Sequence, residues 1–124
     1  MELFDKSQYT SQNHPLAINI GRVLREKAGK HLPRPVVAFL ERLIHQREIN
    51  DILYRYGHLA GKDFLEALVK EFQLDIDWVH AERLPASGRC IFVSNHPLGG
   101  LDGISLSYML AERYGDVRYM VSDL

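Results

Sequence analysis

The sequence predicts an α/β fold, in which N-terminal helices are followed by the first strands of a mainly parallel sheet. Two features of the sequence favour this fold class. Apolar residues recur at helical spacing through residues 13–73, and compact apolar runs alternate with a single helical pattern in residues 75–124. With 46% hydrophobic and 25% charged residues, the composition is that of an ordinary globular protein.

Residues 1–74 are expected to form an N-terminal helical region. Stripes of apolar residues predict three helices, over residues 13–30, 36–56 and 64–73. Pro15 suits the first position of the first helix, because a missing N–H is harmless there. Asp63 is the expected N-cap of the third helix, with Glu66 completing a capping box. The segment "HLPRP" separates the first two helices.

Residues 75–124 are expected to begin an α/β domain. The pattern predicts a helix over 103–114, ended by Gly115, and strands over residues 76–84, 89–95 and 117–123. Trp78 is more simply a core residue of its strand than an interfacial anchor. The last two strands and the helix between them form a β-α-β unit with a right-handed crossover. Because a parallel sheet needs more strands than these, we expect the chain to be a truncated, N-terminal part of a longer protein, or else an unusually small sheet domain.

Charge and cysteine content narrow the function classes. Residues 1–62 hold ten Lys or Arg and six Asp or Glu, a net charge of +4, whereas residues 63–124 hold five and ten, a net charge of −5. The basic half suits either an ordinary solvated helical face or contact with anionic lipid headgroups. The single cysteine, Cys90, excludes an internal disulfide, and the scattered histidines predict no metal site. The N-terminus has no apolar core of a secretory signal, and no apolar run approaches the roughly 18 residues that span a bilayer.

The stretch "SNHPLGGLDG" contains the candidate functional loop, because its His96 directly follows the predicted strand 89–95. His96 is a candidate general base, and Asp102 is a carboxylate that orients it and stabilises the imidazolium. Gly99 and Gly100 allow the turn that brings the two together and the close approach of a substrate. Asn95 is expected to shape the loop. The structural alternative is that Asp102 only caps the following helix.

The tetrapeptide "NHPL" occurs twice, at 13–16 and at 95–98, and the two copies differ in their surroundings. The first copy follows no predicted strand and has Ile20 where the second has Asp102. We expect the first copy simply to begin a helix. The tetrapeptide alone therefore carries little functional information.

The segment "CIFVSNHPLGGLDGISL" resembles the glycerolipid acyltransferase family, which includes the glycerol-phosphate and lysophospholipid acyltransferases. The likeness covers residues 90–124 and is strongest to a bacterial hemolysin-like branch, some members of which are linked to O-acylation of aminolipids. The usual family motif has four residues between histidine and aspartate, whereas five lie between His96 and Asp102.

The resemblance implies an O-acyltransferase that uses the His96–Asp102 pair as a general base. The acyl donor would be acyl-CoA or acyl carrier protein, with no bound cofactor, and the acceptor a lipid-like hydroxyl at a membrane surface. It implies a cytoplasmic protein, peripheral on the inner face of the membrane, with no nucleic-acid partner. Further family motifs would lie beyond Leu124, so we expect the 124-residue piece to be inactive by itself. Two alternatives remain: a non-catalytic module that binds anionic lipid or phosphate, and a thioester or ester hydrolase with the same pair.

Overall fold

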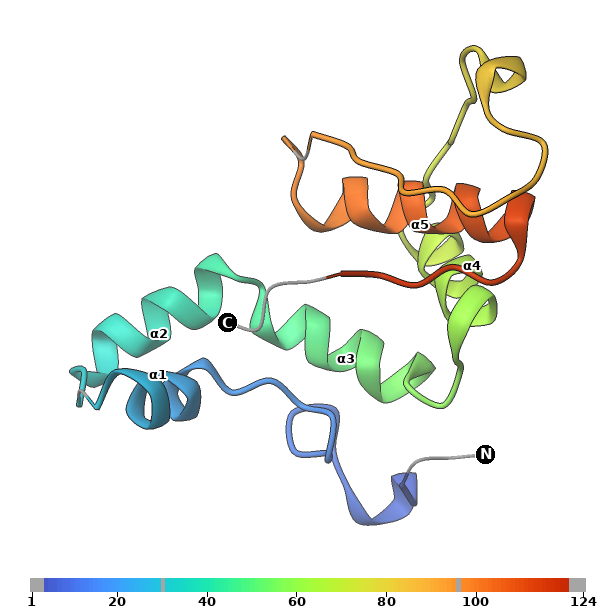
Figure 1. Ribbon diagram of the computed structural model, residues 1–124. Coiled ribbons are helices and arrows are strands. Elements are labelled where there is room, and N and C mark those ends of the chain that lie inside the picture. The colour runs from blue at the N-terminus through green and yellow to red at the C-terminus, as the bar shows by residue number, and fades with distance from the viewer. Residues whose placement is uncertain (1–3, 30, 96, 121–124) are drawn as a thin grey trace. The chain divides into compact units, whose positions relative to one another are not determined.

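The computed structural model describes residues 4–29, 31–95 and 97–120, and within them the regular structure is helical (Figure 1). The α-helices are α1 (Ile20–Ala28), α2 (Arg34–Leu43), α3 (Gln46–Tyr56), α4 (Gly61–Glu71) and α5 (Gly100–Tyr114). Short 3-10 turns lie at Lys6–Gln8 and Ala81–Arg83. The chain divides into two compact units, Met1–Leu59 and Ala60–Leu124. In the described ranges, no helix is both long and apolar enough to cross a membrane.

The predicted parallel sheet is wrong, because the described residues contain no strand. Residues 76–84 pass from irregular backbone through a short turn into the 3-10 helix Ala81–Arg83, and residues 89–95 run without a hydrogen-bonded neighbour strand. Ile91 and Val93 are 82% and 91% exposed. An apolar run indicates a tendency to be buried, but a strand also needs a second segment that pairs with its backbone. The predicted strand 117–123 is not formed up to residue 120, and its remainder lies outside the described residues.

The first helix is shorter than predicted, because its expected first turns are held by α3 instead. The side chain of Asn50, only 1% exposed, accepts from the Ile18 N–H at 2.7 Å and donates to the Ile18 carbonyl at 3.0 Å. These bonds satisfy the backbone of Ile18 outside a helix. Helix α1 then begins at Ile20, with the Asn19 side chain accepting from the Arg22 N–H at 2.9 Å.

The predicted helix over 36–56 is two helices, separated at Ile44 and His45. His45 has a left-handed backbone with φ 53°, which ends α2 and redirects the chain into α3. After this break, Gln46 and Asn50 lie one helical turn apart on α3. The side-chain oxygen of Gln46 accepts from the Ile20 N–H at 2.8 Å. The break thus presents two amide side chains of α3 to the backbone that precedes and starts α1.

The second unit is built on the packing of α4 against α5. Its buried apolar residues come from both helices: Leu65, Leu68, Leu110 and Ala111. Helix α4 begins at Gly61, so Asp63 lies in its first turn and is not the predicted N-cap. Glu66 pairs with Lys70 at 2.6 Å instead of closing a capping box.

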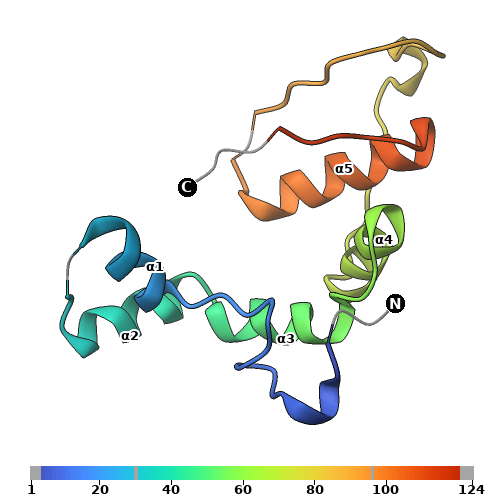
Figure 2. The same cartoon turned by 60° about the horizontal axis from the view of Figure 1, so that its bottom comes forward.

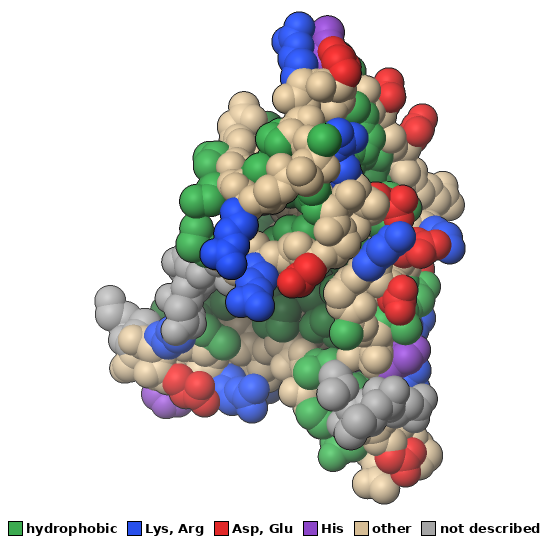
Figure 3. Space-filling view, turned by 45° about the vertical axis from the view of Figure 1, so that its right-hand side comes forward, with side chains coloured by type: hydrophobic (Ala, Val, Ile, Leu, Met, Phe, Trp, Pro, Cys, Tyr) green, Lys and Arg blue, Asp and Glu red, His purple; other side chains and the backbone are tan. Residues whose placement is uncertain are grey.

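Extended segments run beside α5 on the way into and out of that helix. Figures 1 and 2 both show the stretch after residue 88 returning along α5 before it enters the helix. The Phe92 ring lies 5.3 Å from the ring of Tyr114, whose hydroxyl donates to the Pro85 carbonyl at 2.7 Å. Hydrophobic side chains remain open to solvent between charged ones (Figure 3). Met120, in the segment that follows α5, is 92% exposed. The contacts of Tyr114 with Phe92 and Pro85 hold the incoming segment beside α5. That segment leads to the first turn of α5, where the candidate loop ends.

Candidate functional site

The candidate loop enters α5 through Gly99, whose backbone conformation only glycine adopts readily. Gly99, the N-cap of α5, has φ 66° and ψ −126°, and Gly100 is the first helical residue. The predicted need for an unusual backbone is confirmed at Gly99, whereas Gly100 has no positive φ. A Cβ added to either residue would meet no described atom within 4 Å, so space remains beside the loop.

Asp102 lies in the first turn of α5, as the third helical residue and not as its N-cap. Its carboxylate oxygen Oδ2 accepts from the Leu98 N–H at 2.6 Å. This bond fixes the loop relative to the helix, and the negative charge is favourable near the positive end of the helix dipole. A carboxylate has several lone-pair sites, so one such bond does not exhaust its capacity to accept.

The structure says less about the other predicted site residues, His96 and Asn95. His96 lies outside the described residues, so its contact with Asp102 stays a prediction. Asn95 is exposed, and its backbone carbonyl accepts from the Ser94 hydroxyl at 2.8 Å. Across the described ranges, no group of three or more His, Cys, Asp or Glu side chains is placed to hold a metal ion.

The first "NHPL" copy has a structural role, and the prediction that it begins a helix is wrong. His14 is 5% exposed, and its Nε2–H donates to the backbone carbonyl of Asn50 at 3.0 Å. The ring stacks on Phe4, with centroids 5.1 Å apart. Because a carbonyl can only accept, this bond places the ring proton on Nε2. The buried imidazole holds the N-terminal segment on α3.

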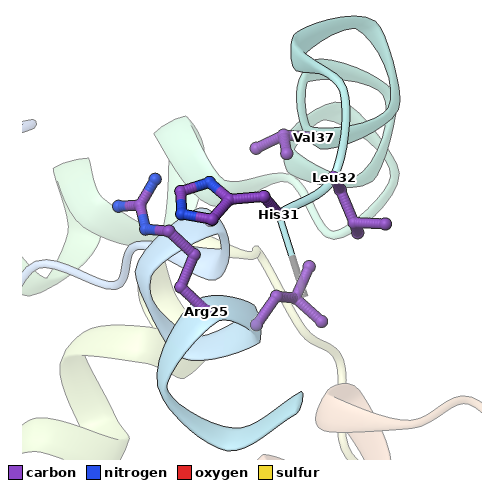
Figure 4. A pocket seen from close by; sticks show the side chains of 6 residues that line it. Arg25, His31, Leu32 and Val37 are labelled. Carbon is purple, nitrogen blue, oxygen red and sulfur yellow. The ribbon is translucent and has the colours of Figure 1, made fainter. Parts of the chain in front are cut away.

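Each unit has a hollow among its described residues. The first, between α1 and the start of α2, measures about 20 Å³, enough for about one water molecule (Figure 4). It is lined by Gly21, Leu24, Arg25, His31, Leu32 and Val37. The second is an open groove of about 270 Å³ along α5, lined by Trp78, Ala81, Met109, Glu112 and Arg113. We call this hollow the α5 groove.

Sequence reasoning missed the α5 groove, because it placed Trp78 in a strand. Trp78 is half-buried beside α5 and belongs to no strand. The available signal was the spacing along α5, since Met109 follows Asp102 by seven residues, about two helical turns. That spacing puts both residues on one face of the helix.

Comparison with known proteins places these features in a family. The sequence matches the family described as Acyltransferase over residues 22–124. It is 45% identical over 111 residues to a lyso-glycine lipid O-acyltransferase of Phocaeicola vulgatus, and 42% identical over 111 residues to one of Bacteroides thetaiotaomicron. These matches cover 86% of this chain but only 40% and 41% of the two relatives. No solved structure matches the sequence. Because the family match spans most of the sequence, the chain belongs to the acyltransferase family.

Proposed function

We propose that the protein transfers a fatty acyl group from a thioester donor to the hydroxyl of a lipid acceptor. The observation that carries the proposal is the family match over residues 22–124, which includes the loop between His96 and Asp102. The two relatives are named for acylation of a lyso-glycine lipid, and at 45% and 42% identity they make a lyso-glycine lipid the proposed acceptor. The proposed donor is acyl-CoA or acyl carrier protein.

In the proposed reaction, His96 acts as a general base and then as a general acid. Its imidazole takes the proton of the acceptor hydroxyl, and the oxygen attacks the thioester carbonyl. The tetrahedral intermediate collapses as the carbon–sulfur bond breaks. The thiolate leaves with the proton from the imidazolium, so the ester and a free thiol are formed and the histidine is restored. No acyl-enzyme is needed, and Cys90 takes no part.

The position of Asp102 supports this mechanism. The 2.6 Å bond from the Leu98 N–H holds the carboxylate against the loop that contains His96. A carboxylate fixed there is suited to accept from one ring nitrogen of His96, so that the other nitrogen takes up the substrate proton. The first-turn N–H groups of α5 are donors for the developing oxyanion.

We also propose that the enzyme works in the cytoplasm, on the inner face of the membrane. Support comes from α2, on which Val36, Phe39 and Leu43 share one face and are 42%, 64% and 61% exposed. Arg42 lies on the same helix and is also exposed, a combination that suits anionic lipid surfaces. Phe39→Glu is expected to reduce sedimentation with vesicles that contain anionic lipid. Unchanged sedimentation would contradict the proposed contact between α2 and the membrane.

Substitution of His96 tests the function. In the intact enzyme, His96→Ala is expected to abolish transfer from acyl-CoA to a lyso-glycine lipid, while the control His58→Ala, at an exposed histidine, keeps it. Transfer by His96→Ala at the normal rate would contradict the general-base role. Thioester cleavage by the unsubstituted enzyme without acceptor would identify a hydrolase. Lipid binding without either reaction would identify a non-catalytic module.

A further inference from the structure

The helix pair α1 and α2 carries the excess positive charge of the first half of the sequence. Residues 20–43 hold six Lys or Arg and two Asp or Glu, a net charge of +4. This equals the net charge of residues 1–62, so the other charges of that half cancel. A local excess of one sign concentrates ligands of the opposite sign beside it. An anion is therefore the class of ligand that this helix pair attracts.

Two basic side chains of the pair meet at the hollow between α1 and α2. Arg25 of α1 and His31, in the connection to α2, both line it, and Figure 4 shows their polar ends on the same side. Both residues are exposed, and within the described ranges neither forms an ion pair. The one carboxylate of α1, Glu26, lies 4.0 Å from the guanidinium of Arg22 instead. Two donors thus face one hollow without an acceptor.

The size of the hollow decides which part of an anion enters it. At about 20 Å³ it accommodates one water molecule, or one oxygen of a larger polar group. A phosphate at its mouth can place one oxygen inside and present others to Arg25, because a planar guanidinium binds two phosphate oxygens at once. The imidazole of His31 adds one N–H donor when neutral and two when protonated.

We infer that Arg25 and His31 form a binding site for the phosphate of an anionic phospholipid headgroup. This inference rests on the proposed function, in which the enzyme meets its acceptor at a membrane. A lipid is favoured over a soluble phosphate because Val37, which also lines the hollow, belongs to α2. The exposed apolar residues Phe39 and Leu43 of that helix carry the proposed membrane contact. A phosphate bound here keeps the enzyme on the surface that holds its acceptor.

Two arginines of α1 provide a matched pair of variants. Arg25→Gln and Arg22→Gln each remove one positive charge from an exposed position of the same helix. The 124-residue chain is sedimented with vesicles of phosphatidylcholine and phosphatidylglycerol in equal parts. Loss of one surface cation weakens such binding roughly fivefold, which is the most we expect from Arg22→Gln. Arg25→Gln also removes the paired hydrogen bonds and should weaken binding at least about twentyfold. Equal losses in the two variants would overturn the inference.

The ring signals of His31 in the NMR spectrum identify the source of the phosphate. Short-chain phosphatidylglycerol, kept below its micelle concentration, should shift these signals at concentrations at least about tenfold lower than inorganic phosphate, because its chains gain from the apolar surface of α2. The signals of His58, an exposed histidine outside the helix pair, should not move. Tighter binding of CoA than of the lipid would assign the site to the donor. Equal binding of lipid and inorganic phosphate would assign it to soluble phosphates, and either result, or unmoved His31 signals, would overturn the inference.

Acyl transfer in detergent micelles separates this inference from the proposed function, because it does not depend on vesicle binding. If Arg25→Gln and Arg22→Gln lose vesicle binding equally while the intact, unsubstituted enzyme transfers acyl groups, the headgroup site fails and the proposed function stands. If Arg25→Gln shows the larger loss but the intact enzyme transfers nothing, the proposed function fails and the headgroup site stands.

Discussion

Asp102 bears two roles, one in the structure and one in the proposed catalysis, and paired substitutions separate them. Asp102→Asn keeps an oxygen that accepts from the Leu98 N–H, but removes the charge. Asp102→Ala removes both the hydrogen bond and the charge. If the carboxylate orients His96, the two variants should be similarly inactive yet differ in stability.

The expected stability changes follow from the contacts of the carboxylate. A hydrogen bond to a charged group contributes about 1.5–3 kcal/mol, and an acidic group in the first helical turn about 0.3–1 kcal/mol. Leu98 is 69% exposed, so water can replace part of the lost hydrogen bond. We therefore expect Asp102→Ala to lower the free energy of unfolding by about 1–2 kcal/mol, and Asp102→Asn by less than about 1 kcal/mol.

The expected loss of activity is much larger. General acid–base catalysis contributes about 10²–10⁴-fold, so both variants should lose at least about 100-fold in kcat. The assay measures transfer from acyl-CoA to a lyso-glycine lipid, with urea unfolding of the same samples, and Asp116→Asn is the control at an exposed carboxylate. Nearly full activity in Asp102→Asn, with a loss only in Asp102→Ala, would refute the orienting role and leave Asp102 as a loop-fixing residue.

Three further predictions concern the fold. Asn50→Ala removes two hydrogen bonds to backbone groups and should cost about 2–3 kcal/mol, with faster amide exchange before α1; unchanged exchange would contradict the fixing role of Asn50. Gly99→Ala forces a side chain to φ 66° and should cost about 1–3 kcal/mol in urea unfolding, whereas Gly100→Ala, the control, should cost nothing. The Glu112 carboxylate raises the pKa of Lys62 above its ordinary 10.5. Their pair therefore stabilises the fold below pH 10.5 and is lost as the pH rises through the raised pKa of Lys62. Lys62→Gln should be destabilising at neutral pH and should have no such effect above that raised pKa; a pH-independent difference would exclude this coupling.

The sequence by itself determined the features that depend on neighbouring residues. Helical spacing of apolar residues located α4 and α5, and the start of α2, to within a few residues, because amphipathic periodicity is a local property. Gly115, with φ 78°, ends α5 as predicted, and Gly99 has the backbone that its loop required. The loop motif was enough to recognise the acyltransferase family, because such a motif is defined by residue types at fixed spacing in the sequence.

The tertiary structure alone decided what depends on residues far apart in the chain. Asn50 holds Ile18 outside a helix, which no pattern within residues 13–30 records. The predicted strands failed because a ladder needs a partner segment, and an apolar run does not specify one. The α5 groove joins Trp78 to Met109 across 31 positions of the sequence, and only packing brings the two side chains together.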